Sequence, residues 1–191
     1  MGNSDYENAR QINLAAGACL KKGDFRGALE NFSRALELLP ADELEAKARL
    51  HSNIGHVQVN LQRYDDALSS FRNAGKIFRQ LGDKIGQGEQ FGNIGSVHRD
   101  MEKWAASLDS YFRALEVFQE VGHRAGIADQ YSNLGYAHSR QGTLRNALQF
   151  FEKARAIYAE LGEEKKSQLC DQNLRALKSY LKERDSLNEG S

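Results

Sequence analysis

The sequence repeats one short phrase, a small residue followed by asparagine, an aliphatic residue and glycine, at a fixed spacing. The copies are Ser52-Asn53-Ile54-Gly55, Gly92-Asn93-Ile94-Gly95 and Ser132-Asn133-Leu134-Gly135, with a partial copy at Asp171-Gln172-Asn173-Leu174. The asparagines of successive copies are 40 residues apart. A fixed period of this size is typical of stacked arrays, in which each repeat buries its apolar face only against its neighbours. We therefore expect function on a continuous surface and not in one deep pocket.

A second block follows each phrase and combines small with large apolar residues. Its members are Ala67, Leu68, Phe71 and Ala74, then Tyr111 and Ala114, then Ala147, Leu148, Phe151 and Ala154, and an earlier copy holds Ala28, Leu29, Phe32, Ala35 and Leu36 and ends at Pro40. Small residues let two helices approach closely, and large apolar residues one turn away fill the space between them. The pattern predicts four repeats, each a pair of helices.

The combined spacing of an apolar residue, Ile/Leu-Gly and then Ala-x-x-x-Phe/Tyr resembles the tetratricopeptide repeat (TPR) family. The first slot holds Ile12, His51, Phe91 and Tyr131, where the family usually has Trp. The resemblance covers roughly residues 5–185. It implies an all-α fold, a right-handed α-solenoid of TPR-like helix pairs with a C-terminal capping helix.

The period of 40 residues is longer than the common TPR period of about 34 residues. The additional residues lengthen the second helix of each pair and end at Gly82, Gly122 and Gly162. Glycine most easily takes the left-handed conformation that follows a helix C-terminus, so we expect helices to stop at these positions. The long variety resembles the repeats of the spindle-orientation adaptors of the LGN/Pins type and of kinesin light chains.

The periodicity predicts one TPR-like domain over residues 1–191, with repeats at about 8–40, 47–82, 87–122 and 127–162 and a capping helix at about 164–184. The expected helices span about 5–22, 25–38, 42–62, 65–80, 84–102, 105–120, 124–141, 144–160 and 164–184. The capping helix is predicted to cover the last repeat with one stripe, Leu169, Asn173, Leu177, Tyr180 and Leu181. Residues 186–191 are expected to fray.

Composition narrows the possible partners. The chain has 26 basic and 26 acidic residues, interleaved and with zero formal net charge, so it lacks the basic patch of proteins that bind nucleic acid or anionic membranes. No stretch approaches the roughly 20 consecutive apolar residues that span a bilayer, and the N-terminus lacks the layout of a secretory signal. Cys19 and Cys170 lie near opposite ends of the array, so we expect unpaired thiols that are both buried. These features predict a cytoplasmic protein.

The candidate binding site follows the first helix of each pair, which lines the concave surface in a superhelix of this kind. Away from the core stripe, a line at i, i+3 or i+4, and i+7 can be traced along these helices. The candidate partner-binding residues on it are Arg49, Asn53, His56 and Asn60, then Glu89, Asn93, Ser96 and Asp100, then Asp129, Asn133, Tyr136 and Arg140, and finally Asn173.

The asparagines of this line are its most informative members. Asparagine is unfavourable inside helices because its amide competes with the backbone for hydrogen bonds. A carboxamide offers both a donor and an acceptor, so a row of them can pair with the backbone of an extended peptide. In the long-repeat families that this chain resembles, asparagines at this slot contact partner peptides, which implies the same role for Asn53, Asn93, Asn133 and Asn173. The alternative is that each asparagine bonds to a neighbouring helix and fixes the stacking.

Catalytic chemistry is not expected. The sequence has no Gly-x-Ser-x-Gly, His-Glu-x-x-His or Lys-Ser/Thr phosphate loop, so we predict neither enzyme activity nor a cofactor. His98 and His138 share a repeat slot where the family usually has an aromatic residue. That placement favours packing over metal ligation, and no metal site is predicted.

The leading hypothesis is a non-catalytic adaptor that binds a protein or peptide partner in its concave groove, without nucleic acid or membrane. The alternative is a self-associating structural scaffold, indicated by the weakly polar first helix with Ile12, Leu14, Ala15, Ala16, Ala18 and Leu20. A monomer is favoured over a homo-oligomer.

Overall fold

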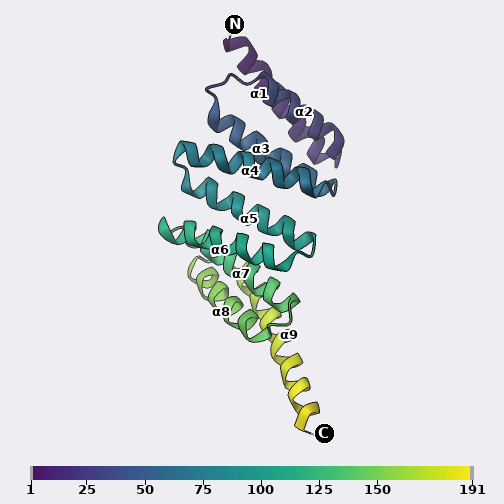
Figure 1. Ribbon diagram of the computed structural model, residues 1–191, viewed down its shortest axis with the longest axis vertical. Helices are drawn as coiled ribbons and strands as arrows, with labels where there is room; N and C mark the ends of the chain where they lie inside the picture. Colours follow the sequence, from purple (N-terminus) through teal and green to yellow (C-terminus); the bar gives the residue numbers. More distant parts are fainter. Residues whose placement is uncertain (1, 190–191) are drawn as a thin grey trace. The chain divides into compact units, whose positions relative to one another are not determined.

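The structure is a computed structural model that describes residues 2–189, except for the side chains of residues 2–4, 185 and 187–189. Within these residues it contains nine α-helices and no strand (Figure 1). The helices are α1 (Gly2–Lys21), α2 (Phe25–Leu38), α3 (Leu44–Asn60), α4 (Tyr64–Leu81), α5 (Lys84–Asp100), α6 (Trp104–Glu120), α7 (Arg124–Arg140), α8 (Leu144–Glu160) and α9 (Glu164–Glu189). The all-α class is confirmed, and the predicted helices agree with these bounds within a few residues, except at the end of α9.

The chain divides into two compact units, which we call the N-terminal half (Met1–Val97) and the C-terminal half (His98–Ser191). In the N-terminal half, α1 packs on α2, α2 on α3, and α3 on α4 (Figure 1). In the C-terminal half, α6 packs on α7, α7 on α8, and α8 on α9. Helices adjacent in sequence therefore pack together within each half, as the repeat pattern predicts. The single domain over residues 1–191 stays a prediction.

The turns follow from local residues. Gly82, Gly122 and Gly162 have φ angles of 72°, 66° and 73°, so the predicted left-handed stops are confirmed. Some helix starts are capped by side chains. Asp24 Oδ1 accepts a hydrogen bond from the Gly27 amide at 2.9 Å, and His123 Nδ1 accepts one from the Gly126 amide at 3.1 Å. Such caps satisfy backbone donors that the first helical turn leaves unpaired.

Close contact between the helices of a pair depends on glycine facing phenylalanine. A Cβ atom on Gly55 of α3 would lie 2.6 Å from a ring carbon of Phe71 in α4. One on Gly135 of α7 would lie 2.9 Å from the ring of Phe151 in α8. Both phenylalanines are buried. The helices approach so closely that only a residue without a side chain fits opposite the ring.

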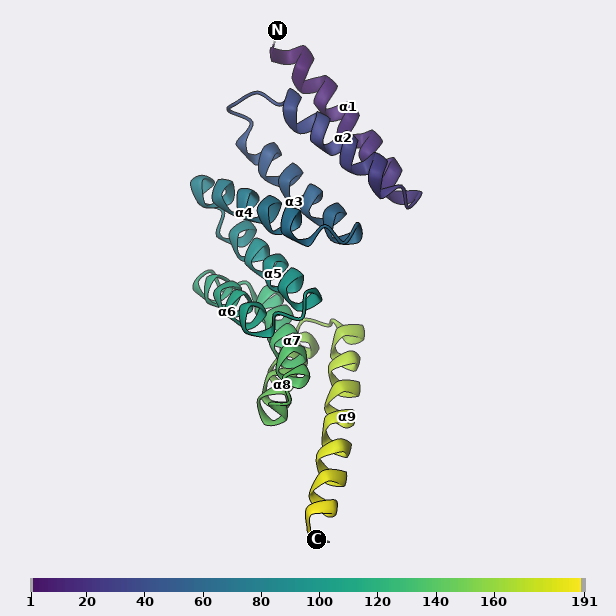
Figure 2. The ribbon, with the colours of Figure 1, turned by 45° about the vertical axis from the view of Figure 1, so that its right-hand side comes forward.

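The capping helix differs from its prediction in two respects. The residues that it buries are Cys170, Leu174 and Leu177, while Leu169 and Tyr180 are 54% and 57% exposed, so the predicted stripe was wrong in those two members. The helix also continues to Glu189, so the fraying expected from residue 186 is wrong for residues 186–189. Residues 190–191 lie outside the described residues. Figure 2 shows the C-terminal part of α9 extending past the end of α8.

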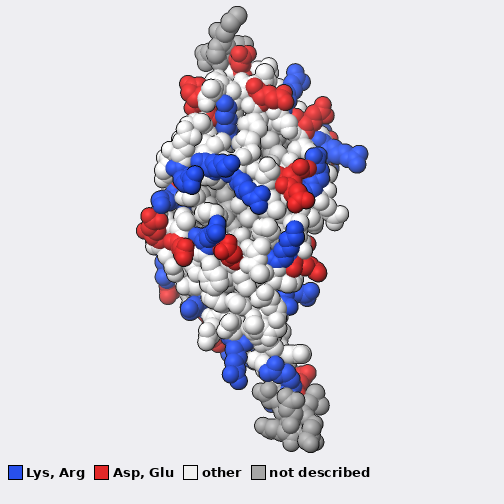
Figure 3. Space-filling view, in the orientation of Figure 1, with Lys and Arg blue, Asp and Glu red and all other residues white. Residues whose placement is uncertain are grey.

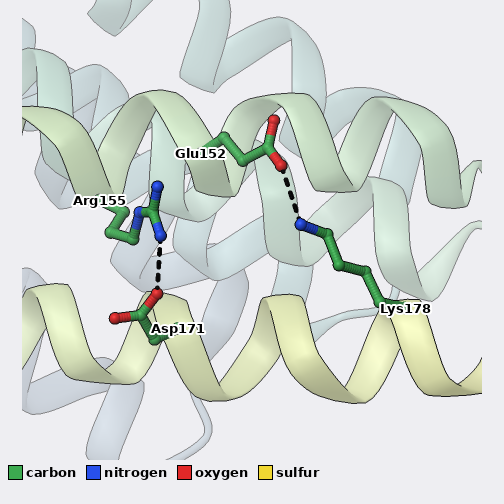
Figure 4. A network of polar contacts seen from close by, with 4 residues as sticks. All are labelled: Glu152, Arg155, Asp171 and Lys178. Carbon is green, nitrogen blue, oxygen red and sulfur yellow. Dashed lines mark hydrogen bonds and ion pairs between the residues drawn. The ribbon is translucent and has the colours of Figure 1, made fainter.

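Two ion pairs hold α9 against α8 (Figure 4). Arg155 and Lys178 each reach across to the facing helix, with Arg155 Nη1 3.0 Å from Asp171 Oδ1 and Lys178 Nζ 3.2 Å from Glu152 Oε1. Both pairs are partly exposed, so each contributes little stability by itself. Each helix contributes the basic residue of one pair and the acidic residue of the other. The two pairs together therefore favour one register of α9 along α8.

Matched glycine substitutions test the close contact. We expect Gly55→Ala to lower the free energy of unfolding by about 1–2 kcal/mol, because overpacking against the Phe71 ring outweighs the better helix propensity of alanine. Gly17→Ala should raise it by up to about 1 kcal/mol, since the added Cβ meets nothing within 4 Å. Urea unfolding followed by circular dichroism measures both, and equal effects would contradict the contact.

Candidate partner-binding surface

The four asparagines Asn53, Asn93, Asn133 and Asn173, which we call the asparagine row, lie at equivalent places on four helices. Asn53 is on α3 and Asn93 on α5 in the N-terminal half, while Asn133 is on α7 and Asn173 on α9 in the C-terminal half. Asn53 is exposed and the other three are half-buried. All four carboxamides are therefore displayed at the surface of their own half of the molecule, and none is enclosed in its core.

The hydrogen bonds of these asparagines bear on the two readings of the row. Among the residues that the structure describes, the side chains of Asn53, Asn133 and Asn173 have no hydrogen-bond partner. Asn93 Nδ2 donates to Gln90 Oε1 at 3.4 Å, but Gln90 is on the same helix. The stacking alternative requires bonds to a neighbouring helix, and none of the four carboxamides makes one within residues 2–189.

The surface around Asn53 is hollowed. A hollow of about 490 Å³ lies between α1 and α3, lined by Arg10, Asn13, Arg49 and Asn53 among others. A second, of about 340 Å³, lies between α3 and α5 and includes Arg49, Asn53 and Glu89. A third, of about 420 Å³, is lined by α1 residues together with Phe32 and Asn53. Asn53 borders all three hollows, so a ligand in any of them would meet its amide.

Helix α1 contributes to this surface although the sequence prediction began at α3. Asn13 borders two of the hollows, and its Oδ1 is buried without a hydrogen-bond partner among the described residues. A buried acceptor without a partner is costly, and such an atom in a folded protein calls for an explanation. Asn13 is therefore a candidate site residue that the sequence prediction missed.

The repeat spacing between α1 and α3 differs from the spacing between the later repeats. Buried Ala16 and Phe32 pack in one cluster and hold the places of Gly55 and Phe71, at a spacing of 39 residues and not 40. The row slot on α1 therefore falls on Leu14, which is 60% exposed. The shorter spacing is visible in the second-helix blocks of the sequence, and applying it to α1 would have located this residue.

Three further predicted residues of the N-terminal half have contacts within their own repeat. The His56 ring meets the Phe71 ring edge-on, with centroids 5.0 Å apart, and burial lowers the pKa of His56. Asn60 Nδ2 donates to the His56 carbonyl at 2.9 Å, which occupies one of its donors. Arg49 pairs with Glu45 at 2.6 Å on the same helix. Ser96 is half-buried on α5.

In the C-terminal half, Asp129 has an internal role. Tyr158 Oη donates to Asp129 Oδ1 at 2.7 Å, and Lys166 Nζ lies 2.8 Å from the same oxygen. Burial raises the pKa of Tyr158, and the bond to Asp129 raises it further. Asp129 thus ties α7 to both α8 and α9. Of the predicted site residues, it is the one whose contacts fit helix stacking best.

Asp100, Tyr136 and Arg140 come together near the turn between α5 and α6. The Arg99 guanidinium lies 5.9 Å from the centre of the Tyr136 ring, and that of Arg140 lies 5.8 Å from the centre of the Trp104 ring. Arg99 Nη2 also pairs with Asp100 Oδ1 at 2.9 Å. Tyr136 and Arg140 are four residues apart on α7, so they share a helix face.

The histidines, the cysteines and the surface charges also bear on predictions made from the sequence. His138 stacks on Phe150 with ring centroids 5.3 Å apart, so its predicted packing role is confirmed. Across the described part of the chain, no three His, Cys, Asp or Glu side chains are grouped as a metal ion would require. Cys19 and Cys170 are both free thiols, and the predicted burial is confirmed for Cys170 but is wrong for Cys19, which is only half-buried. Within residues 2–189 no helix combines the length and apolar character needed to cross a membrane. Acidic and basic side chains alternate over the visible surface (Figure 3).

Comparison with known proteins supports the TPR assignment. Residues 91–160 match the tetratricopeptide repeat family. Among solved structures, the chain resembles BtubC (BKLC) from P. vanneervenii, with a TM-score of 0.68, 20% identity, and coverage of 95% of this chain and 89% of that one. No curated protein matches the chain.

Two other solved structures have higher TM-scores. Aspartyl phosphate phosphatase F from Bacillus subtilis has a TM-score of 0.79 and 16% identity over 94% of this chain, which spans only 50% of that protein. The apo form of RapI has a TM-score of 0.79 and 18% identity over 96% of this chain and 72% of its own. At these identities the likeness concerns the fold alone, which is an all-α, TPR-like arrangement of helix pairs. The resemblance to LGN/Pins-type adaptors and kinesin light chains stays a prediction.

The role of Asp129 leads to a stability prediction. Asp129→Asn should lower the free energy of unfolding by about 1–2 kcal/mol, because it weakens a charge-assisted hydrogen bond and an ion pair together. Asp109→Asn is the matched control. Its exposed pair with Arg113 lies within α6 and is worth no more than about 0.5 kcal/mol. Chemical denaturation of both variants measures the difference, and equal values would contradict a stacking role for Asp129.

Proposed function

We propose that this chain is a non-catalytic adaptor that binds an extended segment of a partner protein along its first helices. The binding residues are Asn53 and Asn93 in the N-terminal half and Asn133 and Asn173 in the C-terminal half. Arg49, His56, Glu89 and Asn13 border the N-terminal part of the surface, and Asp100, Tyr136 and Arg140 border the C-terminal part. The TPR-like fold supports a protein as partner, since repeats of this kind present long surfaces and no enclosed cavity.

The observation that supports the proposal most directly is the unused hydrogen-bonding capacity of the row. The side chains of Asn53, Asn133 and Asn173 have no partner among the described residues, although each carries one acceptor and two donors. An extended backbone presents carbonyl and amide groups along its length. Carboxamides can pair with both, whatever the side chains of the bound segment are. The row would thus hold the backbone, and the charged and aromatic residues beside it would select the sequence.

The proposal carries further expectations from the sequence. We expect no catalytic activity, because the surface residues are asparagines, paired charges and packed rings. We also expect the protein to act in the cytoplasm, where its two free thiols would stay reduced.

A peptide-display selection tests the binding surface. Random 16-residue peptides are selected on the whole chain, and the affinity of the best binder is then measured by titration. Asn133→Ala should weaken binding roughly fivefold, the equivalent of one neutral hydrogen bond of about 1 kcal/mol. Asn53, Asn93 and Asn133 changed together to alanine should weaken it roughly 100-fold.

The matched control is Asn146→Ala, because Asn146 is an exposed asparagine on α8, the second helix of its pair. This variant should bind like the wild type. Circular dichroism checks that every variant remains folded. If the triple variant folds and binds the selected peptide with unchanged affinity, the asparagine row is not the binding surface.

We predict a monomer, because α1 lacks the residues that seal one helix pair against the next. On α3 these are Leu50, Ile54 and Val57, which are buried against α1 and α2. At the 39-residue spacing their places on α1 hold Gln11, Ala15 and Ala18, all exposed. Small and polar residues bury too little apolar area to hold a second copy. Sedimentation velocity over a hundredfold range of concentration should give a constant mass near 21.4 kDa. A species of twice that mass would favour the self-associating scaffold instead.

A further inference from the structure

Two arginine–aromatic contacts join α7 to the end of α5 and to the start of α6 in the C-terminal half. Arg99, at the end of α5, lies against Tyr136 of α7, and Arg140 of α7 lies against Trp104 of α6. We call Arg99, Asp100, Trp104, Tyr136 and Arg140 the arginine–aromatic cluster. Helix α7 contributes the ring to one contact and the guanidinium group to the other, so it contacts both sides of the turn between α5 and α6.

The charges of the cluster are not balanced. Arg99 pairs with Asp100 at 2.9 Å, so these two charges offset each other. Glu102 and Lys103, in the turn before α6, are one acid and one base and are both exposed. Arg140 makes no ion pair or hydrogen bond with any described residue, and its guanidinium group lies over the Trp104 ring. One positive charge therefore remains at the centre of the cluster, with five unused N–H donors.

Other acidic residues nearby on the first helices are already occupied. Asp129 lies about two helical turns before Tyr136 on α7. Its carboxylate accepts hydrogen bonds from Tyr158 and Lys166. A guanidinium that rests on an indole ring keeps its edge free for a carboxylate, which it binds through two parallel hydrogen bonds. Tyr136, 45% exposed, supplies apolar surface next to that edge. The arrangement suits a carboxylate on a short, partly apolar side chain.

We infer that Arg140 binds an acidic side chain, Asp or Glu, of the partner segment, with the Trp104 and Tyr136 rings flanking it. This inference rests on the proposed function and adds the chemical class of the partner: a peptide with an acidic residue at one fixed position. The asparagine row binds the backbone of any segment, whereas the arginine–aromatic cluster distinguishes acidic segments from neutral ones. A nucleic acid fits this surface poorly, because the cluster has only one arginine without an ion pair, whereas nucleic-acid binding rests on several phosphate contacts.

Trp104 makes the contact observable, since it is the only tryptophan in the chain. The probe is the highest-affinity 16-residue peptide from the selection described above. Each Asp or Glu of that peptide is changed in turn to Asn or Gln, and binding to the whole chain is followed by tryptophan fluorescence. We expect one such change to weaken binding about threefold to fivefold, as for a partly exposed ion pair. The effect should shrink between about 0.1 M and about 1 M salt, where screening shortens from about 10 Å to about 3 Å.

A double-mutant cycle then tests which residue the acid contacts. Arg140→Gln should weaken the original peptide by the same threefold to fivefold and should leave the neutralised peptide unaffected, because the interaction has already been removed. Arg145→Gln is the matched control. It removes the same charge from an exposed arginine on α8 of the same half, and it should leave the affinity for both peptides unchanged.

The outcomes separate this inference from the proposed function. If the Asn53, Asn93 and Asn133 variants weaken binding while Arg140→Gln does not, the adaptor surface stands and the acidic specificity is overturned. Independent effects of Arg140→Gln and of the peptide change would also overturn it. If instead the cycle shows coupling while the asparagine variants bind normally, the acidic contact stands and the asparagine row is wrong. Arg140→Lys adds a check on geometry, since a lysine cannot make the paired contact and should restore only part of the affinity.

Discussion

The close approach of the two helices in each pair is the constraint on which the rest of the structure depends. In two pairs a ring on the second helix lies where a Cβ atom would be, as Phe71 does over Gly55 and Phe151 over Gly135. In the first pair the small Ala16 holds the place of the glycine in the cluster with Phe32. Because one helix face is committed to this contact, the rotation of the first helix about its axis is fixed. The side chains two positions before the glycine then face away from the second helix. Those positions are Asn53 and Asn133, so the packing that buries the rings also displays the amides.

This coupling explains why a degenerate sequence still specifies one surface. The slots that contact the partner helix vary in size but stay apolar or small, while the row keeps its asparagines although asparagine weakens a helix. A residue that is unfavourable for local structure and makes no hydrogen bond to a neighbouring helix has no stabilising role in the folded chain. Functional residues are expected where the sequence departs from what stability alone would choose. The row asparagines fit that description, whereas Asp129, with its bonds to Tyr158 and Lys166, does not.

The sequence predicted the helices and their stops well because these depend on local signals. The 40-residue period and the positions of Gly82, Gly122 and Gly162 needed no tertiary information. Three features depended on it. The stripe of α9 was misassigned at Leu169 and Tyr180 because the helix has no following neighbour to identify its second face. The internal contacts of Asp129 come from residues 29 and 37 positions away, so the sequence alone did not reveal them. Helix α1 was left out of the site because its row slot holds Leu14, and a pattern search that follows asparagine passes over it.

Net charge gives a poor description of such a surface, because what matters is which charges are already paired. The chain has equal numbers of acidic and basic residues, and from that balance alone the charge of a partner cannot be inferred. Ion pairs such as Arg49 with Glu45 and Arg99 with Asp100 remove most of the candidate charges from consideration. Arg140 and Lys153 differ from these residues, because aromatic rings and not carboxylates lie against them. A cation–π contact orients a guanidinium without neutralising it, so the charge remains available to a ligand. Selectivity on a surface with no net charge can therefore arise from one residue whose internal partner is a ring.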